Sequence, residues 1–237
     1  MDFSIIFDNI GIYLTGLKHT VLLVSISLAI GLLMAIPLAV LRTSKNFLVS
    51  APIRAYVYFF RGTPLLVQMF LMYYGMGQFE AVKASIVWPL FKEAYFCALF
   101  AFTLNTGAYT TEIIRGAIEA TPHGEIEAAR AMGMSRFLMF RRIVLPSAFR
   151  RALPTYSNEM IFMLHGSSLA SVITIVDITG AARIINSRFY SPYEAFLTAA
   201  VFYMALTFLI VWSVKKLEFK WFAHLRPQAA LQTKAHT

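Results

Sequence analysis

Residues 122–146 of this 237-residue chain read PHGEIEAARAMGMSRFLMFRRIVLP and separate two apolar segments. Thr121 and Pro122 form the pattern of a helix cap followed by proline at the first helical position. The helix that begins here is predicted to stop at Gly133, because glycine most readily takes the left-handed conformation that closes a helix. Ser135 is predicted to cap a second short helix, which runs to the final proline. The stretch therefore predicts two short helices joined by a glycine elbow.

The composition of the chain indicates a membrane protein. Hydrophobic residues make up 58% of it and charged residues only 14%, whereas a typical soluble domain is about 25% charged. A helix needs about 20 mostly apolar residues to cross the hydrocarbon core of a bilayer. Five stretches of the chain qualify, so we predict an all-α integral membrane protein with five transmembrane helices. The predicted helices cover about residues 20–41, 55–79, 94–114, 152–176 and 195–214.

The lysines and arginines predict the orientation of these helices. If the N-terminus is outside, 15 of the 21 lie in cytoplasmic segments, five lie outside, and Arg61 lies within the second helix. Positive charge concentrates on the cytoplasmic side of membrane proteins. We therefore predict an outside N-terminus, a cytoplasmic C-terminus and a cytoplasmic loop at about residues 115–151. Residues 1–226 are predicted to form one transmembrane domain, and residues 227–237 a disordered tail.

The spacing inside the loop resembles a known motif. Glu127-Ala128-Ala129 is followed after three residues by Gly133 and, after nine more, by Ile143-Val144-Leu145-Pro146. This pattern resembles the EAA loop of the membrane subunits of ATP-binding-cassette (ABC) importers, and all of its fixed positions are present. The resemblance implies a type I ABC importer permease fold in the bacterial inner (cytoplasmic) membrane, with the loop forming coupling helices. The implied ATPase-coupling residues are Glu127, Ala128, Ala129, Gly133, Ile143, Leu145 and Pro146.

The same resemblance implies several partners. The chain has no G-x-x-x-x-G-K-S/T loop for nucleotide phosphates, so we expect no enzymatic activity in the chain itself and expect ATP and Mg²⁺ on a cytoplasmic ABC ATPase dimer. A soluble periplasmic or extracellular substrate-binding protein is implied, as is a homologous second permease subunit. We expect a heterodimeric permease, with two copies of this chain as the alternative. Membrane lipid is expected around the helices, and the net charge of +9 requires no nucleic acid partner. With Cys97 as its single cysteine, the chain has no metal-binding cysteine spacing, and we expect no cofactor bound to it.

Further segments narrow the resemblance to the polar amino acid permeases. These segments are Arg61–Gln68, Asn105–Glu112, Pro122–Glu125 and Tyr156–Glu159. Within that group, residues 122–131 and 163–165 look most like the membrane subunit of the histidine/lysine/arginine/ornithine importer and of its opine-importing relatives. The resemblance implies import of a basic amino acid (arginine, lysine, ornithine or histidine) or of an opine. The chain departs from many relatives at Gly166, where they carry a polar or charged residue, so this position has no side chain to offer to a ligand.

Polar residues of the fourth predicted helix are candidates for the substrate path. Glu159 lies about eight residues beyond Arg151, which is roughly 12 Å along a helix and close to mid-membrane. A charged group at that depth is costly and usually faces a protein interior or a water-filled path. Glycine and serine at residues 166–168 can loosen the helix above it and leave backbone groups to line a cavity. The predicted path residues are Asn158, Glu159, Ser167 and Ser168, and a purely structural hydrogen bond is the alternative for Glu159.

Other polar residues have simpler predicted roles. Glu112 and Arg115 lie three residues apart on one helix, so we expect a local ion pair. His165 is expected to be a hydrogen-bonded interior residue, and Asp177 to be solvated at the outer end of its helix. We predict no catalytic residue, because no Ser-His-Asp order, H-E-x-x-H motif or suitably spaced pair of aspartates occurs. A membrane-embedded enzyme and an ion channel are the alternative classes, and a channel would need neither an ATPase nor an EAA loop. We therefore predict a transporter subunit that works by alternating access.

Overall fold

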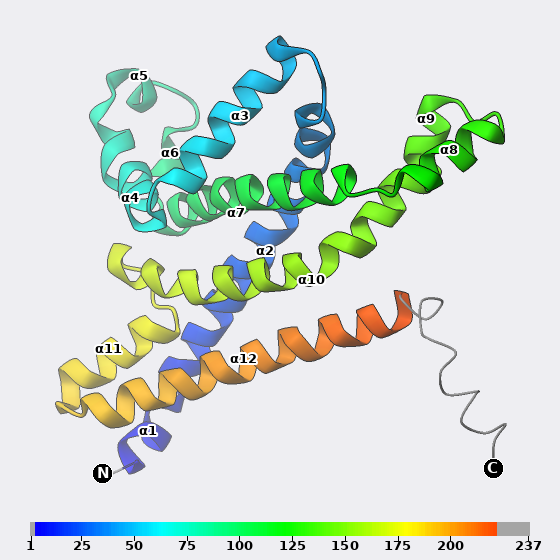
Figure 1. Cartoon of the computed structure of the whole chain (residues 1–237). Coiled ribbons are helices and arrows are strands. Elements are labelled where there is room, and N and C mark those ends of the chain that lie inside the picture. The colour runs from blue at the N-terminus through cyan, green and yellow to red at the C-terminus, as the bar shows by residue number, and fades with distance from the viewer. Residues whose placement is uncertain (1–2, 222–237) are drawn as a thin grey trace, which may run out of the picture.

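The computed structural model describes residues 3–221, and every regular element in that range is a helix. In chain order the elements are α1 (Ser4–Asp8), α2 (Ile10–Arg42), α3 (Phe47–Gly62), α4 (Leu65–Phe70), η1 (Leu71–Gly75), η2 (Met76–Gln78), α5 (Glu80–Lys83), α6 (Trp88–Phe91), α7 (Ala94–Glu119), α8 (His123–Ala131), α9 (Arg136–Met139), η3 (Phe140–Val144), α10 (Leu145–Gly166), η4 (Ser167–Ile173), α11 (Ile178–Phe189) and α12 (Pro192–Trp221). The predicted tail at residues 227–237 lies outside the described range. The long helices α2, α7, α10 and α12 build the bundle (Figure 1).

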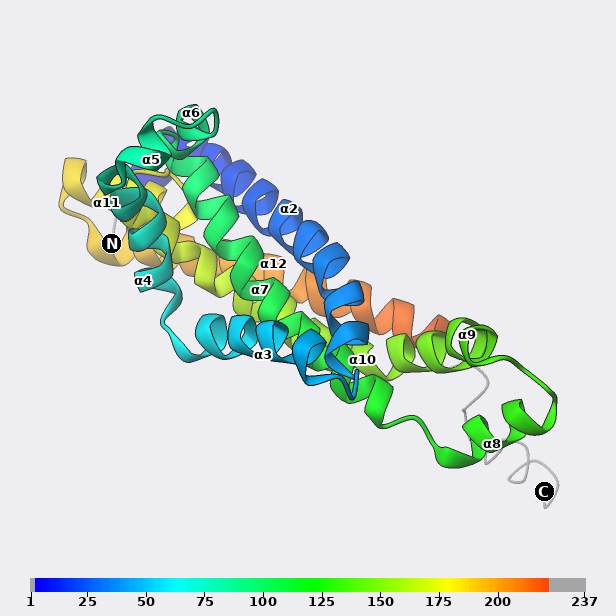
Figure 2. The ribbon, with the colours of Figure 1, turned by 90° about the horizontal axis from the view of Figure 1, so that it is seen from above.

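Helices α2 and α7 make the most extensive contact between any two helices of the described range, and Figure 2 shows them side by side. At Gly31 of α2, an added Cβ would lie 2.6 Å from Cγ2 of Thr106 and 3.2 Å from the backbone nitrogen of Gly107. On α7, a Cβ at Gly107 would lie 2.9 Å from the Tyr56 hydroxyl, which donates a hydrogen bond of 2.7 Å to the Leu104 carbonyl. Small residues therefore let α2, α7 and α3 approach closely, as is common between transmembrane helices.

Three buried apolar clusters follow one another along α2. The first includes Tyr13 and joins α2 to α11 and α12. The second includes Leu23 and Phe102 and joins α2 to α7, α4 and α10. The third includes Ala35 and Ala148 and joins the other end of α2 to α7 and α10. Helix α2 is therefore the element that connects the core from one end of the bundle to the other.

Length and composition support fewer spans than the five predicted. Within residues 3–221, α2 with 33 residues and α12 with 30 are long and apolar enough to cross a membrane. The run Arg136–Ile173 together with Ile178–Phe189 adds a third if this pair, bent by 47°, is counted as one span. The predicted span at 55–79 is interrupted, because α3 ends at Gly62 and α4 begins only at Leu65. The span at 94–114 lies in α7, which is one helix but carries buried threonine and asparagine side chains. Five spans remain a prediction.

The helices extend beyond the predicted boundaries. Helix α2 begins at Ile10, and α7 continues to Glu119, so the connection that was predicted to begin at about residue 115 is shorter. The second helix of the loop was predicted to stop at Pro146, and this prediction was wrong. The chain instead continues from α9 through the π-helical turn η3 into α10. Pro146 is the second residue of α10 and follows η3 without a break, so it has no backbone N–H to donate to the preceding helical turn.

The two ends of the bundle carry different segments. Helices α1, α5, α6 and α11 gather at one end, and α8 and α9 project from the other (Figures 1 and 2). The end of α12 points toward the end that carries α8 and α9. The segments that the charge distribution predicts to be outside therefore lie together, opposite those predicted to be cytoplasmic. The orientation of the bundle in a membrane remains a prediction.

Candidate functional site

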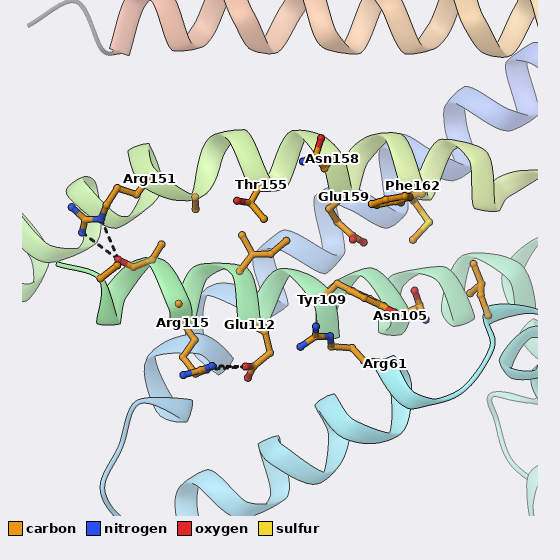
Figure 3. A pocket seen from close by; sticks show the side chains of 17 residues that line it. Arg61, Asn105, Tyr109, Glu112, Arg115, Arg151, Thr155, Asn158, Glu159 and Phe162 are labelled. Carbon is orange, nitrogen blue, oxygen red and sulfur yellow. Dashed lines mark hydrogen bonds and ion pairs between the residues drawn. The ribbon is translucent and has the colours of Figure 1, made fainter. Parts of the chain in front are cut away.

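A cavity of about 990 Å³ lies between α7 and α10 and reaches the ends of α3 and α4 (Figure 3). Its volume is at the upper end of the range for small-molecule sites, which is about 300–1,000 Å³. The wall combines apolar side chains such as Leu65, Phe162 and Met163 with many polar ones. The polar lining residues are Arg61, Asn105, Tyr109, Glu112, Arg115, Arg151, Thr155, Asn158 and Glu159.

Glu159 is the most deeply buried acidic group of this cavity. Its relative exposure is 6%, and its carboxylate points from α10 toward α7 and the end of α3 (Figure 3). Within residues 3–221 it forms no ion pair, although it interacts with the Thr106 side chain of α7 and, more weakly, with the Arg61 guanidinium. That guanidinium lies over the Tyr109 ring, 5.0 Å from its centroid. A buried carboxylate without an ion pair is costly, so its position on a cavity wall marks a candidate functional group.

The position of Arg61 depends on hydrogen bonds at the end of α3. The Asn105 amide of α7 donates to the Phe60 carbonyl at 3.1 Å and to the Gln68 side-chain oxygen at 3.0 Å. The Gln68 amide donates to the Phe60 and Thr63 carbonyls at 2.8 and 3.0 Å. These bonds satisfy carbonyl groups that have no partner where a helix ends. They fix the break between α3 and α4, and with it the placement of Arg61.

Charged side chains join α2 to α7 at the opposite end of the cavity. Arg115 lies 2.8 Å from the Glu112 carboxylate, which confirms the predicted local ion pair. The other oxygen of Glu112 lies 3.4 Å from Nε of Arg42, at the end of α2. Arg115 also pairs with Glu119 one turn later. Three of these residues belong to α7, so the sequence could indicate their pairing, but the contribution of Arg42 depends on helix packing.

Arg151 connects three elements near the same end of the cavity. Its guanidinium donates to the Ala117 carbonyl in the last turn of α7 at 3.2 Å and to the Thr121 hydroxyl just after α7 at 2.8 Å. It also donates to the Ser147 hydroxyl at 2.7 Å, and that hydroxyl donates to the Glu125 carboxylate of α8 at 3.2 Å. Sequence reasoning treated Arg151 only as a positive charge. Ser147 lies one turn away on α10, but Ala117 and Thr121 come from a distant segment, so no local pattern could have revealed the connection to α7.

The start of α8 differs from the prediction. The residue at the cap position is Pro122, which makes no side-chain hydrogen bond there, and the helix begins at His123. The predicted cap, Thr121, instead donates from its hydroxyl to the Ile118 carbonyl at 2.7 Å and accepts from Arg151. The predicted Thr121 cap was therefore wrong, because the end of α7 engages the hydroxyl.

The predicted elbow after α8 is confirmed. Gly133 has a φ of 73°, and its N–H donates to the Arg130 carbonyl at 2.9 Å. This is the left-handed closure that glycine adopts without a steric penalty. The Ser135 hydroxyl accepts from the backbone nitrogen of Leu138 at 3.3 Å and caps α9 as predicted.

The predicted ATPase-coupling residues are divided between the projecting α8–α9 segment and the start of α10. Glu127 and Ala128 are exposed on α8, whereas Ala129 is only 2% exposed. The large apolar side chains of Met132 and Phe137 are 79% and 74% exposed on either side of the elbow. The remaining residues with a predicted coupling role are Gly133 at the elbow, Ile143 in η3, and Leu145 and Pro146 in α10.

The four predicted path residues divide into two pairs. Asn158 and Glu159 line the cavity, whereas Ser167 and Ser168 do not. The serine hydroxyls donate to the Leu164 and His165 carbonyls at 2.6 and 2.7 Å. Helix α10 does end at Gly166 and continues as the 3₁₀ turns of η4, so the predicted loosening of the helix is present.

Two further predictions on polar side chains were wrong. Asp177 is fully buried, because its carboxylate caps α11 by accepting from the Gly180 nitrogen at 2.8 Å and also accepts from the Tyr203 hydroxyl at 3.0 Å. His165 is exposed rather than interior, with its ring nitrogen 3.3 Å from the Thr207 hydroxyl. Both positions follow from the packing of α12 against α10 and α11, which local sequence does not encode.

Potential metal ligands do not gather in the described part of the chain. Among residues 3–221, no group of three or more histidine, cysteine, aspartate or glutamate side chains could hold a metal ion. The Cys97 thiol is buried and lies 3.3 Å from the Phe91 carbonyl. The chemistry of the cavity is therefore that of charged and amide side chains, which can recognise a small polar ligand.

Comparison with known proteins gives a consistent result. Residues 27–222 match the family described as the binding-protein-dependent transport system inner membrane component. The chain is 50% identical over 211 residues to the nopaline transport system permease protein NocM of Agrobacterium fabrum, with 89% of this chain and 88% of that protein covered. It is 45% identical over 220 residues to the histidine/lysine/arginine/ornithine transport system permease protein HisM of Escherichia coli, with 92% of each chain covered.

Solved structures share the fold. A crystal structure of an amino acid ABC transporter with histidines matches this chain with a TM-score of 0.83 and 32% sequence identity. The match covers 93% of this chain and 99% of the chain in that structure. An inward-facing structure of the MetNI methionine ABC transporter has a TM-score of 0.73 at 17% identity, with 89% and 96% covered. The all-helical fold is thus that of type I ABC importer permeases. The chain belongs to the family of binding-protein-dependent transport system inner membrane components and is a permease subunit of an ABC importer.

Proposed function

We propose that this permease subunit carries a basic amino acid, or an opine built from one, through the cavity between α7 and α10. The observation that carries the proposal is the buried Glu159 carboxylate, which forms no ion pair within residues 3–221 and faces a cavity of about 990 Å³. A cationic ligand is the chemical complement of such a group. The names of the relatives NocM and HisM support the same substrate class.

The path combines negative charge with weaker polar contacts. Glu159 supplies the charge, and the Asn158 amide lies beside it on the cavity wall. Thr155 and Tyr109 add further polar groups to the same wall, whereas the Ser167 and Ser168 hydroxyls, which were predicted path groups, lie outside the cavity and bind backbone carbonyls. Several moderate contacts suit a transporter, because a substrate that binds too tightly does not leave.

The proposed membrane arrangement has five spans, with the N-terminus outside and the C-terminus in the cytoplasm. Helix α7 and the broken α3–α4 segment form the two spans that composition alone supports least. Their polar residues face the cavity and neighbouring helices, as Asn105 and Gln68 do. Polar side chains inside a membrane are tolerated in such protein-facing positions.

The projecting elbow of α8 and α9 is the proposed contact with a cytoplasmic ABC ATPase dimer, which binds ATP and Mg²⁺. Exposed Met132 and Phe137 give it an apolar surface for a groove on that partner. The contacts of Arg151 connect α8 to α10, the helix that carries Glu159. Closure of the ATPase dimer would thus move the cavity wall and drive alternating access.

Two further partners complete the proposed importer. A homologous second permease subunit pairs with this chain in a heterodimer, and a periplasmic or extracellular binding protein delivers the substrate to the end of the bundle that carries α5, α6 and α11. Substrate selectivity is then shared between the two proteins, because the binding protein selects the ligand and the charged groups of the path in this subunit favour a cationic one.

The orientation can be tested by thiol labelling in a Cys97→Ser background. Single cysteines are introduced at the exposed positions Lys83 and His123, which belong to α5 and α8 at opposite ends of the bundle. They are treated with a membrane-impermeant maleimide. In cells whose outer barrier is permeable, we expect the cysteine at position 83 to react, and the one at position 123 to react only after the cells are opened. Labelling of position 123 in unopened cells would refute the orientation.

The coupling role of the elbow can be tested at Gly133. Gly133→Val forces a β-branched residue into a left-handed conformation, which costs about 1–2 kcal/mol or more. We expect uptake to fall by roughly tenfold or more at unchanged membrane abundance. Gly124→Val is the control, because Gly124 lies in the same loop with an ordinary φ and open space for a Cβ, and it should retain most of the uptake. Equal uptake by both variants would contradict the role of the closing turn.

The role of Glu159 can be tested with Glu159→Gln, which keeps shape and hydrogen bonding but removes charge. At pH 7.5, arginine and lysine are cationic, whereas the histidine side chain is mostly neutral. We expect uptake of arginine and lysine to fall by about tenfold and that of histidine by much less, since a hydrogen bond to a charged group contributes about 1.5–3 kcal/mol. If the uptake of all three amino acids stays at the wild-type level, Glu159 has a structural role. If the three uptake rates fall equally, Glu159 does not recognise the charge of the substrate.

A further inference from the structure

The cavity contains a second charged group whose role differs from that of Glu159. Arg61 lines the wall at the end of α3 and is solvent-exposed. Within residues 3–221 its guanidinium has no hydrogen bond or ion pair, and it is held by stacking on the Tyr109 ring at 5.0 Å. A surface arginine is usually mobile, because it loses side-chain entropy when it is ordered. Here an aromatic face holds the planar group and leaves its N–H donors available to a ligand.

The backbone beneath Arg61 is also fixed. Asn105 and Gln68 bind the Phe60 carbonyl, one residue before Arg61, at 3.1 and 2.8 Å. The chain then breaks at residues 63–64, so Arg61 lies in the last turn of α3. Hydrogen bonds therefore fix the backbone next to Arg61, and the Tyr109 ring holds its guanidinium. Such preorganisation lowers the entropic cost of binding.

From this geometry we infer that Arg61 is a carboxylate-binding residue of the path, which takes the carboxylate of the substrate while Glu159 takes its cationic group. This inference rests on the proposed function and adds a second point of recognition to it. The two charges face one cavity from α3 and α10, with Tyr109 of α7 beside them (Figure 3). A guanidinium presents paired N–H donors that match the two oxygens of a carboxylate.

Two-point recognition predicts a specific substrate class. The ligand must carry a carboxylate and a separate positive group, as arginine, lysine and opines built from them do. An amine without a carboxylate offers no partner to the Arg61 guanidinium. Its binding is disfavoured, because its positive charge is repelled by that of Arg61. When no ligand is bound, the electrostatic interaction between Arg61 and Glu159 partly compensates both charges. A ligand with both groups replaces that interaction with two direct contacts.

The test measures ligand binding to the complete complex of this chain with its partner subunits in detergent, without the binding protein. The probes are L-arginine and agmatine, which is arginine without its carboxylate, and titration calorimetry gives both dissociation constants. We expect wild type to bind arginine about tenfold more tightly than agmatine. We expect Arg61→Gln to weaken arginine binding by about tenfold, and not to weaken agmatine binding, because agmatine loses no contact and is relieved of the repulsion from Arg61. Glu159→Gln should weaken the binding of both probes.

Two control variants separate this role from a structural one. Arg54→Gln makes the same change on the same helix at an exposed position that does not line the cavity, and it should keep the wild-type preference for arginine. Tyr109→Phe keeps the ring under Arg61 and should also keep the wild-type preference for arginine. Tyr109→Leu removes the ring and should reduce that preference. Size-exclusion profiles and membrane abundance show whether each variant is folded.

The outcomes distinguish the two proposals. If Arg61→Gln retains the wild-type preference for arginine, or if wild type binds the two probes equally or binds neither, the carboxylate site is wrong. The proposed path is tested separately by uptake in Glu159→Gln. A loss of arginine and lysine uptake in that variant, together with an unchanged preference in Arg61→Gln, would leave the path in place and overturn only the role of Arg61.

Discussion

The structure depends on the close approach of α2 to α7. Gly31 and Gly107 leave no room for larger side chains, because an added Cβ would lie 2.6 Å from Thr106 at one position and 2.9 Å from the Tyr56 hydroxyl at the other. In hydrocarbon, where the hydrophobic effect does not drive helices together, such close packing is a main source of association. It holds α7 between α2 and α3, so the opposite face of α7 can line a cavity with α10 without collapse of the bundle.

The cavity combines rigidity at one end with a connection to the surface at the other. Asn105 and Gln68 fix the end of α3, and Arg61 is placed by that end. At the opposite end, Arg151 binds the last turn of α7 and, through Ser147, reaches Glu125 of the projecting loop. In the proposed mechanism, a force applied to α8 reaches the helix that carries Glu159 through hydrogen bonds rather than through flexible chain. The carboxylate can therefore change its surroundings during transport while α2 and α7 stay packed.

Sequence alone predicted the class of protein and the local features of the loop. Gly133 and the Ser135 cap could be predicted because their conformations depend on neighbouring residues. The Thr121 cap failed, since its hydroxyl binds the end of α7 and Arg151. The spans at 55–79 and 94–114 were harder to assign, because Thr63 and Pro64 interrupt the first and polar residues that face other helices reduce the hydropathy of the second.

The candidate site was only partly predictable for the same reason. Asn158 and Glu159 could be selected as polar residues at mid-helix, where charge is costly, and both line the cavity. Ser167 and Ser168 looked equally suitable in sequence, but their hydroxyls bind the preceding turn of α10. The role of Arg61 depends on the Tyr109 ring, which lies far away in the chain and reaches it only through packing. Local patterns identify groups that need an explanation, and the tertiary structure decides which of them meet.

We propose that this chain provides a passage for a basic substrate, and that transport through it is coupled to ATP hydrolysis by a partner subunit. The most direct test is ATPase activity of the importer reconstituted with its binding protein and a panel of amino acids. The account predicts that arginine, lysine or a related basic compound stimulates hydrolysis severalfold, whereas leucine and glutamate do not. Equal stimulation by neutral and acidic amino acids, or hydrolysis that is indifferent to every ligand of the panel, would contradict it.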